Sequence, residues 1–174
     1  MSYRDHIISF SLPLLVLIVI PSCLVVFSND FILGWGFDPT SDILLSLLGF
    51  ILIVCGVTLL IKCIRIFSRM GEGTLAPWAP TKNLVVSGLY RRTRNPMISG
   101  VLIALLGESV LLSSLPIFAW FILALIGNHI YFIKSEESGL FARFGDEYRI
   151  YMEHVPRWIP RRTPSYPEYA QDDN

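Results

Sequence analysis

The sequence predicts an all-α integral membrane protein with four transmembrane helices. Of its 174 residues, 53% are hydrophobic, the mean hydropathy is +0.56, and the apolar residues gather in four long runs. We expect one domain over residues 1–162, in which the helices are accompanied by a loop on the cytoplasmic membrane surface and an amphipathic C-terminal helix. Residues 163–174 are predicted to form a polar C-terminal tail.

Two of the runs are long enough to cross a membrane. Residues 7–27 and 43–61 contain no charged side chain, and each can span a hydrocarbon core of about 30 Å at about 1.5 Å per residue. A signal peptide is the alternative for the first run. It is disfavoured because the run is longer than a usual signal core, contains Pro13 and Pro21, and follows a single basic residue, Arg4.

The other two runs are close neighbours in the sequence. Residues 97–112 and 116–133 are separated only by Ser113, Ser114 and Leu115. Such a short connection predicts a helical hairpin whose turn lies at the far membrane surface.

The basic residues indicate how the helices are oriented. The connections 28–42 and 113–115 contain no lysine or arginine, whereas all fourteen such residues lie at the opposite ends of the runs. The positive-inside rule assigns that basic side to the cytoplasm and gives a multi-pass protein with both termini cytoplasmic. Because the formal net charge of zero hides this polarity, it says little about partners, and nothing suggests nucleic acid.

Several other classes of site are not indicated. The chain has three cysteines without CxxC spacing, so we expect neither a disulfide framework nor a zinc site. The three histidines are scattered and lack a second ligand at helical spacing, so we expect no metal. No P-loop is present, and no glycine-rich nucleotide motif follows a strand.

The first polar segment of interest reads "GLYRRTRNPMISG", residues 88–100. Asn95 is a favoured N-cap and Pro96 suits the first helical position, so the third helix is predicted to begin there. The free N–H groups of its first turn and the positive end of its dipole, together with Arg91, Arg92 and Arg94, would bind an anion. The alternative is that the arginines only follow the positive-inside rule and contact lipid phosphate.

The second polar segment follows the fourth run. Glu136 and Glu137 lie at its cytoplasmic end, and His129 precedes Glu136 by seven residues, which is about two helical turns. Polar groups inside the hydrocarbon usually point into a bundle or cavity, so we expect Glu136 to face inward with His129. Adjacent helical residues are about 100° apart, so Glu137 is expected to have a different role.

Beyond the glutamates, apolar and aromatic residues recur at helical spacing among charged ones. This pattern predicts an amphipathic helix on the membrane surface, although Gly145 weakens it. A lid over a site and a plain membrane anchor both fit the pattern. The recurring residues are Leu140, Phe141, Phe144, Tyr148 and Tyr151.

Several pieces of the chain occur in the order of a known family. They are "GEGT", "PWAPTKNLVVSGLY", "RNPMISG" opening the hairpin, "EE" after it, and "FGDEYRIYMEHVPRWIP". With these pieces, roughly residues 71–162 resemble the integral-membrane methyltransferases related to isoprenylcysteine carboxyl methyltransferase, with the phospholipid N-methyltransferases as more distant relatives. The chain has Asn95 and Ile98 where the prenylcysteine enzymes have His and Tyr, and its Asn-Pro-Met is similar to the phospholipid-methylating branch.

The resemblance implies S-adenosylmethionine as methyl donor, bound at the cytoplasmic ends of the helices. The paired glutamates, Glu136 and Glu137, are implied to complete the pocket. The other matching positions are Gly88, Tyr90, Arg94, Asn95, Pro96 and Gly100.

The chemistry of this cofactor suits the same segments. Arg94 and the helix start at Asn95 suit its carboxylate, and the glutamates suit its ammonium or sulfonium. The edge of its adenine is predicted to contact the backbone groups of Val85, Gly88, Leu89 and Tyr90. Two residues are predicted to be catalytic: Arg157 would orient an anionic acceptor, and Glu137 would take a proton from an amine.

The sequence therefore predicts an S-adenosylmethionine-dependent methyltransferase that acts on a lipophilic or membrane-soluble acceptor, a carboxylate, thiol or amine, with membrane lipid around it. The alternative is a catalytically inactive scaffold or a transporter subunit of the same fold. A transporter is expected to show repeated halves and polar residues near the midplane. In this chain the polar residues crowd one surface instead.

Overall fold

The computed structural model describes residues 12–28, 35–70 and 83–163, and every regular element in these ranges is helical. The elements η1 and η3 are π-helical turns within longer helices, and η2 is a 3₁₀ turn. The predicted all-α fold is thus confirmed for this part of the chain. In order, the elements are η1 (Leu15–Val19), α2 (Ile20–Ser28), α3 (Pro39–Met70), η2 (Gly88–Arg91), α4 (Pro96–Leu111), α5 (Leu115–Tyr131), η3 (Phe132–Glu136) and α6 (Glu137–His154).

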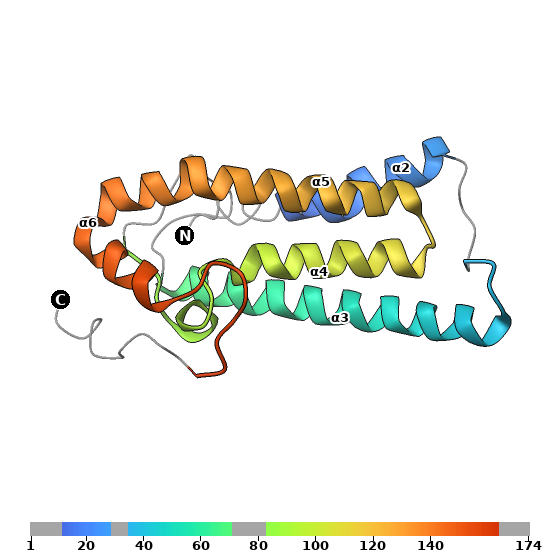
Figure 1. The fold of residues 1–174 in the computed structure, drawn as a ribbon, viewed down its shortest axis with the longest axis horizontal. Helices are drawn as coiled ribbons and strands as arrows, with labels where there is room; N and C mark the ends of the chain where they lie inside the picture. Colours follow the sequence, from blue (N-terminus) through green and yellow to red (C-terminus); the bar gives the residue numbers. More distant parts are fainter. Residues whose placement is uncertain (1–11, 29–34, 71–82, 164–174) are drawn as a thin grey trace.

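The long helices lie alongside one another, with α4 packed against both α3 and α5, and α2 packed against α5 (Figure 1). Two helices are long and apolar enough to cross a membrane, Pro39–Ile66 and the stretch Leu115–His154. Most of their apolar side chains face outward, unlike those of a core helix in a soluble protein.

Two shorter apolar helices, Leu12–Ser28 and Pro96–Leu111, accompany the two long ones. The four predicted runs therefore all contain apolar helices, and two of these meet the length of a membrane span. Residues 7–11 of the first run lie outside the described residues. That all four helices cross the membrane stays a prediction.

The predicted hairpin is confirmed between α4 and α5. Helix α4 ends at Leu111 and α5 begins at Leu115. Ser114 is the N-cap of α5, and its hydroxyl accepts a hydrogen bond from the backbone N–H of Ile117 at 3.4 Å. Ser113 takes a positive φ of 50°, which turns the chain sharply between the helices.

Glycines set the close approach of α3 and α4. A Cβ atom on Gly107 would lie 2.7 Å from the carbonyl oxygen of Gly49 and 2.7 Å from the backbone nitrogen of Ile53. A Cβ atom on Gly100 would lie 2.9 Å from the carbonyl oxygen of Gly56. No side chain fits at these positions, so the two backbones touch, as small residues allow in membrane helices.

The π-helical turn η1 ties the first helix to α5. The backbone N–H of Ile20 bonds to the carbonyl of Leu15, five residues earlier. The carbonyl of Val16 therefore loses its usual donor, and the next residue, Pro21, has no N–H to replace it. The indole N–H of Trp120 on α5 donates to this carbonyl at 3.2 Å. This bond satisfies a backbone acceptor that could not bind water in the hydrocarbon core of a bilayer.

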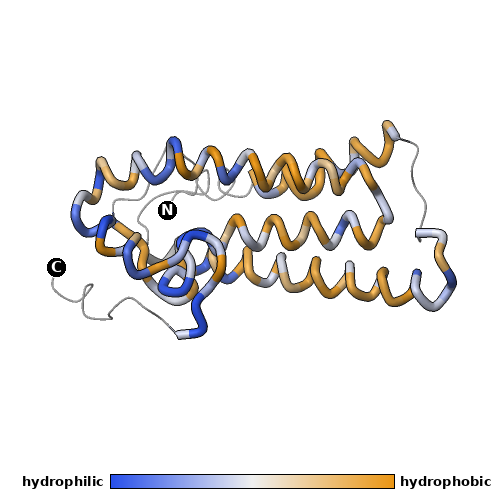
Figure 2. The backbone as a smooth tube through the Cα atoms, viewed as in Figure 1, coloured by the Kyte–Doolittle hydropathy of each residue, from blue (hydrophilic) through white to orange (hydrophobic). Residues whose placement is uncertain are grey.

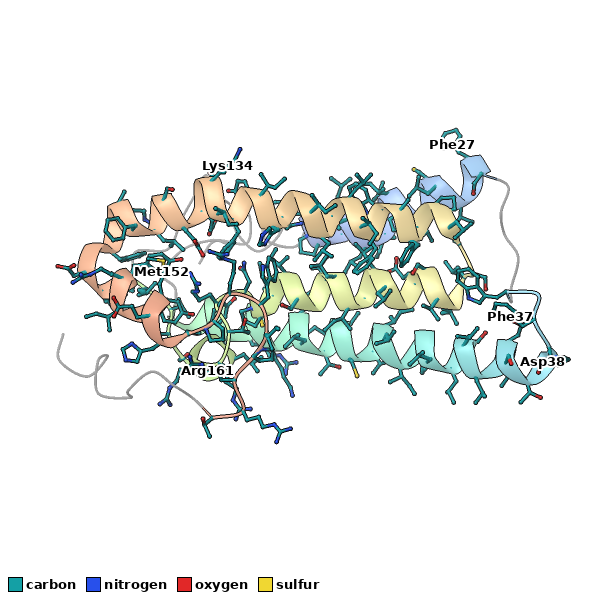
Figure 3. The ribbon with its side chains drawn as sticks, viewed as in Figure 1. Phe27, Phe37, Asp38, Lys134, Met152 and Arg161 are labelled. Atoms are coloured by element: carbon teal, nitrogen blue, oxygen red, sulfur yellow. The ribbon has the colours of Figure 1, made fainter. Side chains whose placement is uncertain are left out.

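Hydrophilic residues gather at one end of the bundle. Figure 2 shows them on α6 and on the segment before α4, whereas the parallel stretches of the long helices are mostly hydrophobic. Met152 and Arg161 lie at this end, and Phe37 and Asp38 lie at the other (Figure 3). The predicted surface loop belongs to the hydrophilic end from residue 83 on, and its earlier part, 71–82, lies outside the described residues.

The predicted amphipathic C-terminal helix is present but bent. Gly145 adopts φ 53° and ψ −126° within α6, a conformation that glycine takes at little cost. Beyond the bend, Tyr148, Tyr151 and Val155 are buried against Val86. Gly145, which was expected to weaken the helix, instead bends it, so that the end of α6 turns back toward the bundle (Figure 1).

Candidate functional site

The candidate site is built around the basic elbow, residues 91–96, where the chain enters α4. Pro96 is the first residue of α4 and Asn95 is its N-cap, as predicted. The Asn95 side chain makes no capping hydrogen bond, which corrects the expected role of that side chain. Its carbonyl instead accepts from the backbone N–H of Ser99 at 3.1 Å and from the Ser99 hydroxyl at 2.9 Å.

A partly buried ion-pair cluster joins the elbow to the start of α6. Arg94 Nη1 donates to Glu137 Oε1 at 2.6 Å. Arg157 adds a bidentate contact, with Nε 2.8 Å from Oε1 and Nη2 2.8 Å from Oε2. The side chains of Arg94 and Glu137 are only 11% and 13% exposed, and the carboxylate of Glu137 raises the pKa of Arg157.

This cluster confirms that the basic entry to α4 and the acidic exit from α5 lie together. The sequence left open which glutamate would meet the arginines. The arginine cluster contains Glu137, and the inward-facing role expected of Glu136, which is half-buried, stays a prediction. Within the described residues, no ion pair links Glu136 to Arg94 or Arg157.

The π-helical turn η3 explains the choice of glutamate. In an α-helix the residue seven positions after His129 would share its face. A π turn adds about one residue to a helical turn, so the eighth residue, Glu137, takes that face instead. Side-chain periodicity carries no signal for this insertion, so the glutamate that meets the arginines could not be chosen from the sequence.

The C-terminal strap, residues 155–161, crosses the elbow and is hydrogen-bonded to it. The backbone N–H of Arg94 donates to the carbonyl of Pro156 at 2.9 Å. The buried hydroxyl of Thr93 donates to the carbonyl of Arg157 at 3.0 Å. The backbone N–H of Arg161 donates to the carbonyl of Arg92 at 3.0 Å, so main-chain contacts run along the whole strap.

The strap also reaches α5. Trp158 Nε1 donates to His129 Nδ1 at 3.0 Å, and the Trp158 ring lies 6.2 Å, centroid to centroid, from the rings of both His129 and Phe132. His129 therefore pairs with the strap rather than with Glu136. Its neighbour Asn128 donates to the Ala124 carbonyl of its own helix at 2.7 Å.

The 3₁₀ turn η2, just before the elbow, is fixed by the core. Tyr90 is buried with Cys63 and Val85, and Leu89 packs against them. The Tyr90 carbonyl accepts a hydrogen bond from the Tyr151 hydroxyl at 2.7 Å. Burial raises the pKa of Tyr90 well above its ordinary value, so its phenol stays neutral. Because these side chains face the core, the predicted adenine contacts would come from their backbone groups.

The two glycines predicted to contact the cofactor lie in different surroundings. Gly88 begins η2 with φ 56°, and a Cβ atom there would lie 2.9 Å from Ile66 Cδ1. Gly100 lies on the face of α4 that packs against α3, next to Gly56. The structure thus gives Gly100 a packing role, and cofactor binding by either glycine stays a prediction.

Three buried polar atoms near the cluster have no hydrogen-bond partner among the described residues: Arg94 Nε, Asn95 Nδ2 and the hydroxyl of Tyr148. The helical spacing of Tyr148 in the sequence predicts only a place on the apolar face of an amphipathic helix. Its helical spacing predicted burial correctly, but nothing in that spacing indicated that its hydroxyl would reach Arg94. The strap was likewise missed, apart from Arg157, because its contacts are made by backbone groups.

A family model described as Phospholipid methyltransferase matches residues 44–147. The match covers most of α3, the elbow, the α4–α5 hairpin and Glu137, and it ends before the strap. Neither the curated proteins nor the solved structures gave a match.

Proposed function

This chain belongs to the phospholipid methyltransferase family, and on that premise we propose that it is an S-adenosylmethionine-dependent membrane enzyme that methylates a lipid-type acceptor. The observation that carries the proposal is the meeting of Arg94, Glu137 and Arg157 at the hydrophilic end of an apolar bundle. There a water-soluble methyl donor can approach from the cytoplasm while an apolar acceptor approaches from the bilayer. Four transmembrane helices with both termini in the cytoplasm are part of the proposal.

The residues at the elbow fit the amino-acid end of this cofactor. Arg94 Nε and Asn95 Nδ2 are buried donors without a partner among the described residues, and they lie at the positive end of the α4 dipole. Such donors suit a carboxylate. Glu136, which is half-buried at the end of η3, suits the ammonium or the sulfonium, and the backbone of residues 85–90 suits the adenine edge.

When bound, S-adenosylmethionine supplies an electrophilic methyl group for in-line displacement by the acceptor. The protein's contribution is then mostly placement and exclusion of water, and placement is worth about 7–11 kcal/mol in well-aligned cases. We propose that Glu137 and Arg157, first predicted to be catalytic, position Arg94 instead, because Glu137 is paired with Arg94 and Arg157 is paired with Glu137. For an amine acceptor, Glu136 is the carboxylate that we assign to proton removal.

The test is cofactor binding and methyl transfer by the detergent-purified full chain. Calorimetry should detect S-adenosylmethionine binding, and mass spectrometry should detect a methyl-group mass shift in extracted phospholipids but not in small soluble thiols. Arg94→Ala should weaken binding at least about tenfold, since it removes a charged hydrogen-bond donor. Glu136→Gln should weaken it as well, because the carboxylate would no longer face a cationic ligand.

Arg92→Ala is the matched control in the same elbow. The Arg92 side chain is exposed, and the residue contacts the strap through its carbonyl alone in the bonds described above. Binding by this variant should match the wild type. If the folded wild-type chain binds no S-adenosylmethionine, the proposal fails and the non-enzymatic scaffold takes its place.

A further inference from the structure

Tyr148 is the largest fully buried side chain among the described residues, and its hydroxyl has no hydrogen-bond partner among them. Its ring packs with Val86, Tyr151 and Val155, a task that a phenylalanine would perform equally well. A buried hydroxyl without a partner costs about 1–3 kcal/mol. Packing therefore accounts for the ring of Tyr148 and leaves its hydroxyl unexplained.

The neighbouring tyrosine on the same buried face shows the contrast. The rings of Tyr148 and Tyr151 lie 6.0 Å apart, centroid to centroid. The Tyr151 hydroxyl donates to the Tyr90 carbonyl at 2.7 Å, so it has a structural role between α6 and η2. The Tyr148 hydroxyl has no such role, although both residues come from the same turns of α6.

The Tyr148 hydroxyl lies beside the guanidinium of Arg94, from which its oxygen can accept a hydrogen bond, and its O–H remains available as a donor. In that guanidinium Nη1 is bonded to Glu137, whereas Nε is buried and has no partner in the described part of the chain. The adjacent residue, Asn95, also has a buried side-chain nitrogen without a partner there. Two N–H donors and one O–H donor are thus available around the start of α4.

A carboxylate is the ligand that satisfies such a set. It accepts hydrogen bonds only, at about four lone-pair positions on two oxygens. The carboxylate of Glu137 is already used by three bonds from Arg94 and Arg157. A second carboxylate, brought by a ligand, would find three donors and the positive end of a helix dipole.

We infer that the Tyr148 hydroxyl donates a hydrogen bond to the carboxylate of bound S-adenosylmethionine, next to Arg94 Nε and Asn95 Nδ2. This inference deepens the proposed function and rests on it. Tyr148 then distinguishes ligands that carry the amino-acid carboxylate from those that lack it. It also explains why a tyrosine, and not a phenylalanine, is buried beside the elbow.

The experiment compares two ligands on the full chain and on Tyr148→Phe. The ligands are S-adenosylmethionine and decarboxylated S-adenosylmethionine, which keeps the sulfonium, the ammonium and the adenosine. Tyr148→Phe should raise the Kd for the first about tenfold, as expected for a hydrogen bond to a charged group. The Kd for the decarboxylated ligand should stay within about twofold of the wild type, because the lost bond has no counterpart there.

Tyr151→Phe is the matched control, and it should change both Kd values by the same factor. Thermal unfolding without ligand should show that Tyr148→Phe is folded at the temperature of the binding assay, because phenylalanine keeps the ring packing. The inference is overturned if Tyr148→Phe binds S-adenosylmethionine as the wild type does, or if it binds both ligands more weakly by the same factor. Those results would not contradict the proposed function. If the wild type binds neither ligand, both the proposed function and this inference are wrong.

Discussion

At the scale of single residues, one carboxylate holds three segments together. Glu137 at the start of α6 is paired with Arg94 from the elbow and with Arg157 from the strap, and all three side chains are less than 30% exposed. The residue types could be predicted from the sequence, because a basic entry and an acidic exit flank the same hairpin. The choice between two adjacent glutamates could not, because it depends on the π turn η3.

Neutralising Glu137 should lower the free energy of unfolding more than neutralising its neighbour Glu136. Glu137→Gln leaves two partly buried guanidinium groups without their carboxylate, so we expect the free energy of unfolding to fall by about 3 kcal/mol. Glu136→Gln, the matched control, should lower it by less than about 1 kcal/mol. Equilibrium unfolding of cofactor-free protein in detergent measures both, and equal losses would contradict the assignment of Glu137 as the joining residue.

At the scale of elements, the two π turns and the glycine contacts decide how the helices fit. The turn η1 frees the Val16 carbonyl for Trp120, and η3 rotates Glu137 toward the elbow. Apolar runs and a short connection predicted the helices and the hairpin correctly. They could not predict a π turn, which shifts hydrogen bonds by one residue without changing the composition.

The α3–α4 contact gives a prediction at this scale. Gly107→Ala places a Cβ atom 2.7 Å from backbone atoms of Gly49 and Ile53, so the helices must separate, and we expect a loss of about 1–3 kcal/mol in unfolding free energy. Gly127→Ala in α5 is the control, because a Cβ atom there meets nothing within 4 Å and alanine favours a helix by up to about 1 kcal/mol. Unfolding in detergent should separate the two variants, and a loss for Gly127→Ala as large as that for Gly107→Ala would argue against the close contact.

At the scale of the whole molecule, charge and hydropathy divide the protein into two unlike ends. The elbow, α6 and the strap form the hydrophilic end, and the α4–α5 turn lies at the other (Figure 2). In the proposed topology, the end that lacks lysine and arginine, residues 28–42 and 113–115, lies outside. The proposed site would then open to the cytoplasm, where the methyl donor is available.

Cysteine labelling in membrane vesicles tests this orientation. In a chain whose native cysteines are replaced by alanine, Phe37→Cys and Arg161→Cys each introduce one exposed thiol at opposite ends of the bundle. A membrane-impermeant maleimide should label Phe37→Cys in right-side-out vesicles and Arg161→Cys in inverted ones. Labelling of both variants from the same side would contradict a membrane-spanning bundle with a cytoplasmic site.

The sequence by itself determined the helical class, the hairpin and the two charged segments that meet at its base. These follow from apolar run length and basic-residue placement, which are properties of neighbouring residues and of the solvent around them. Only the tertiary structure decided that Glu137 joins the arginines, that Gly100 and Gly107 pack against α3, and that Tyr148 and the strap cover the elbow. Those contacts join residues far apart in the chain, and their register depends on backbone hydrogen bonds that no periodicity of side chains records.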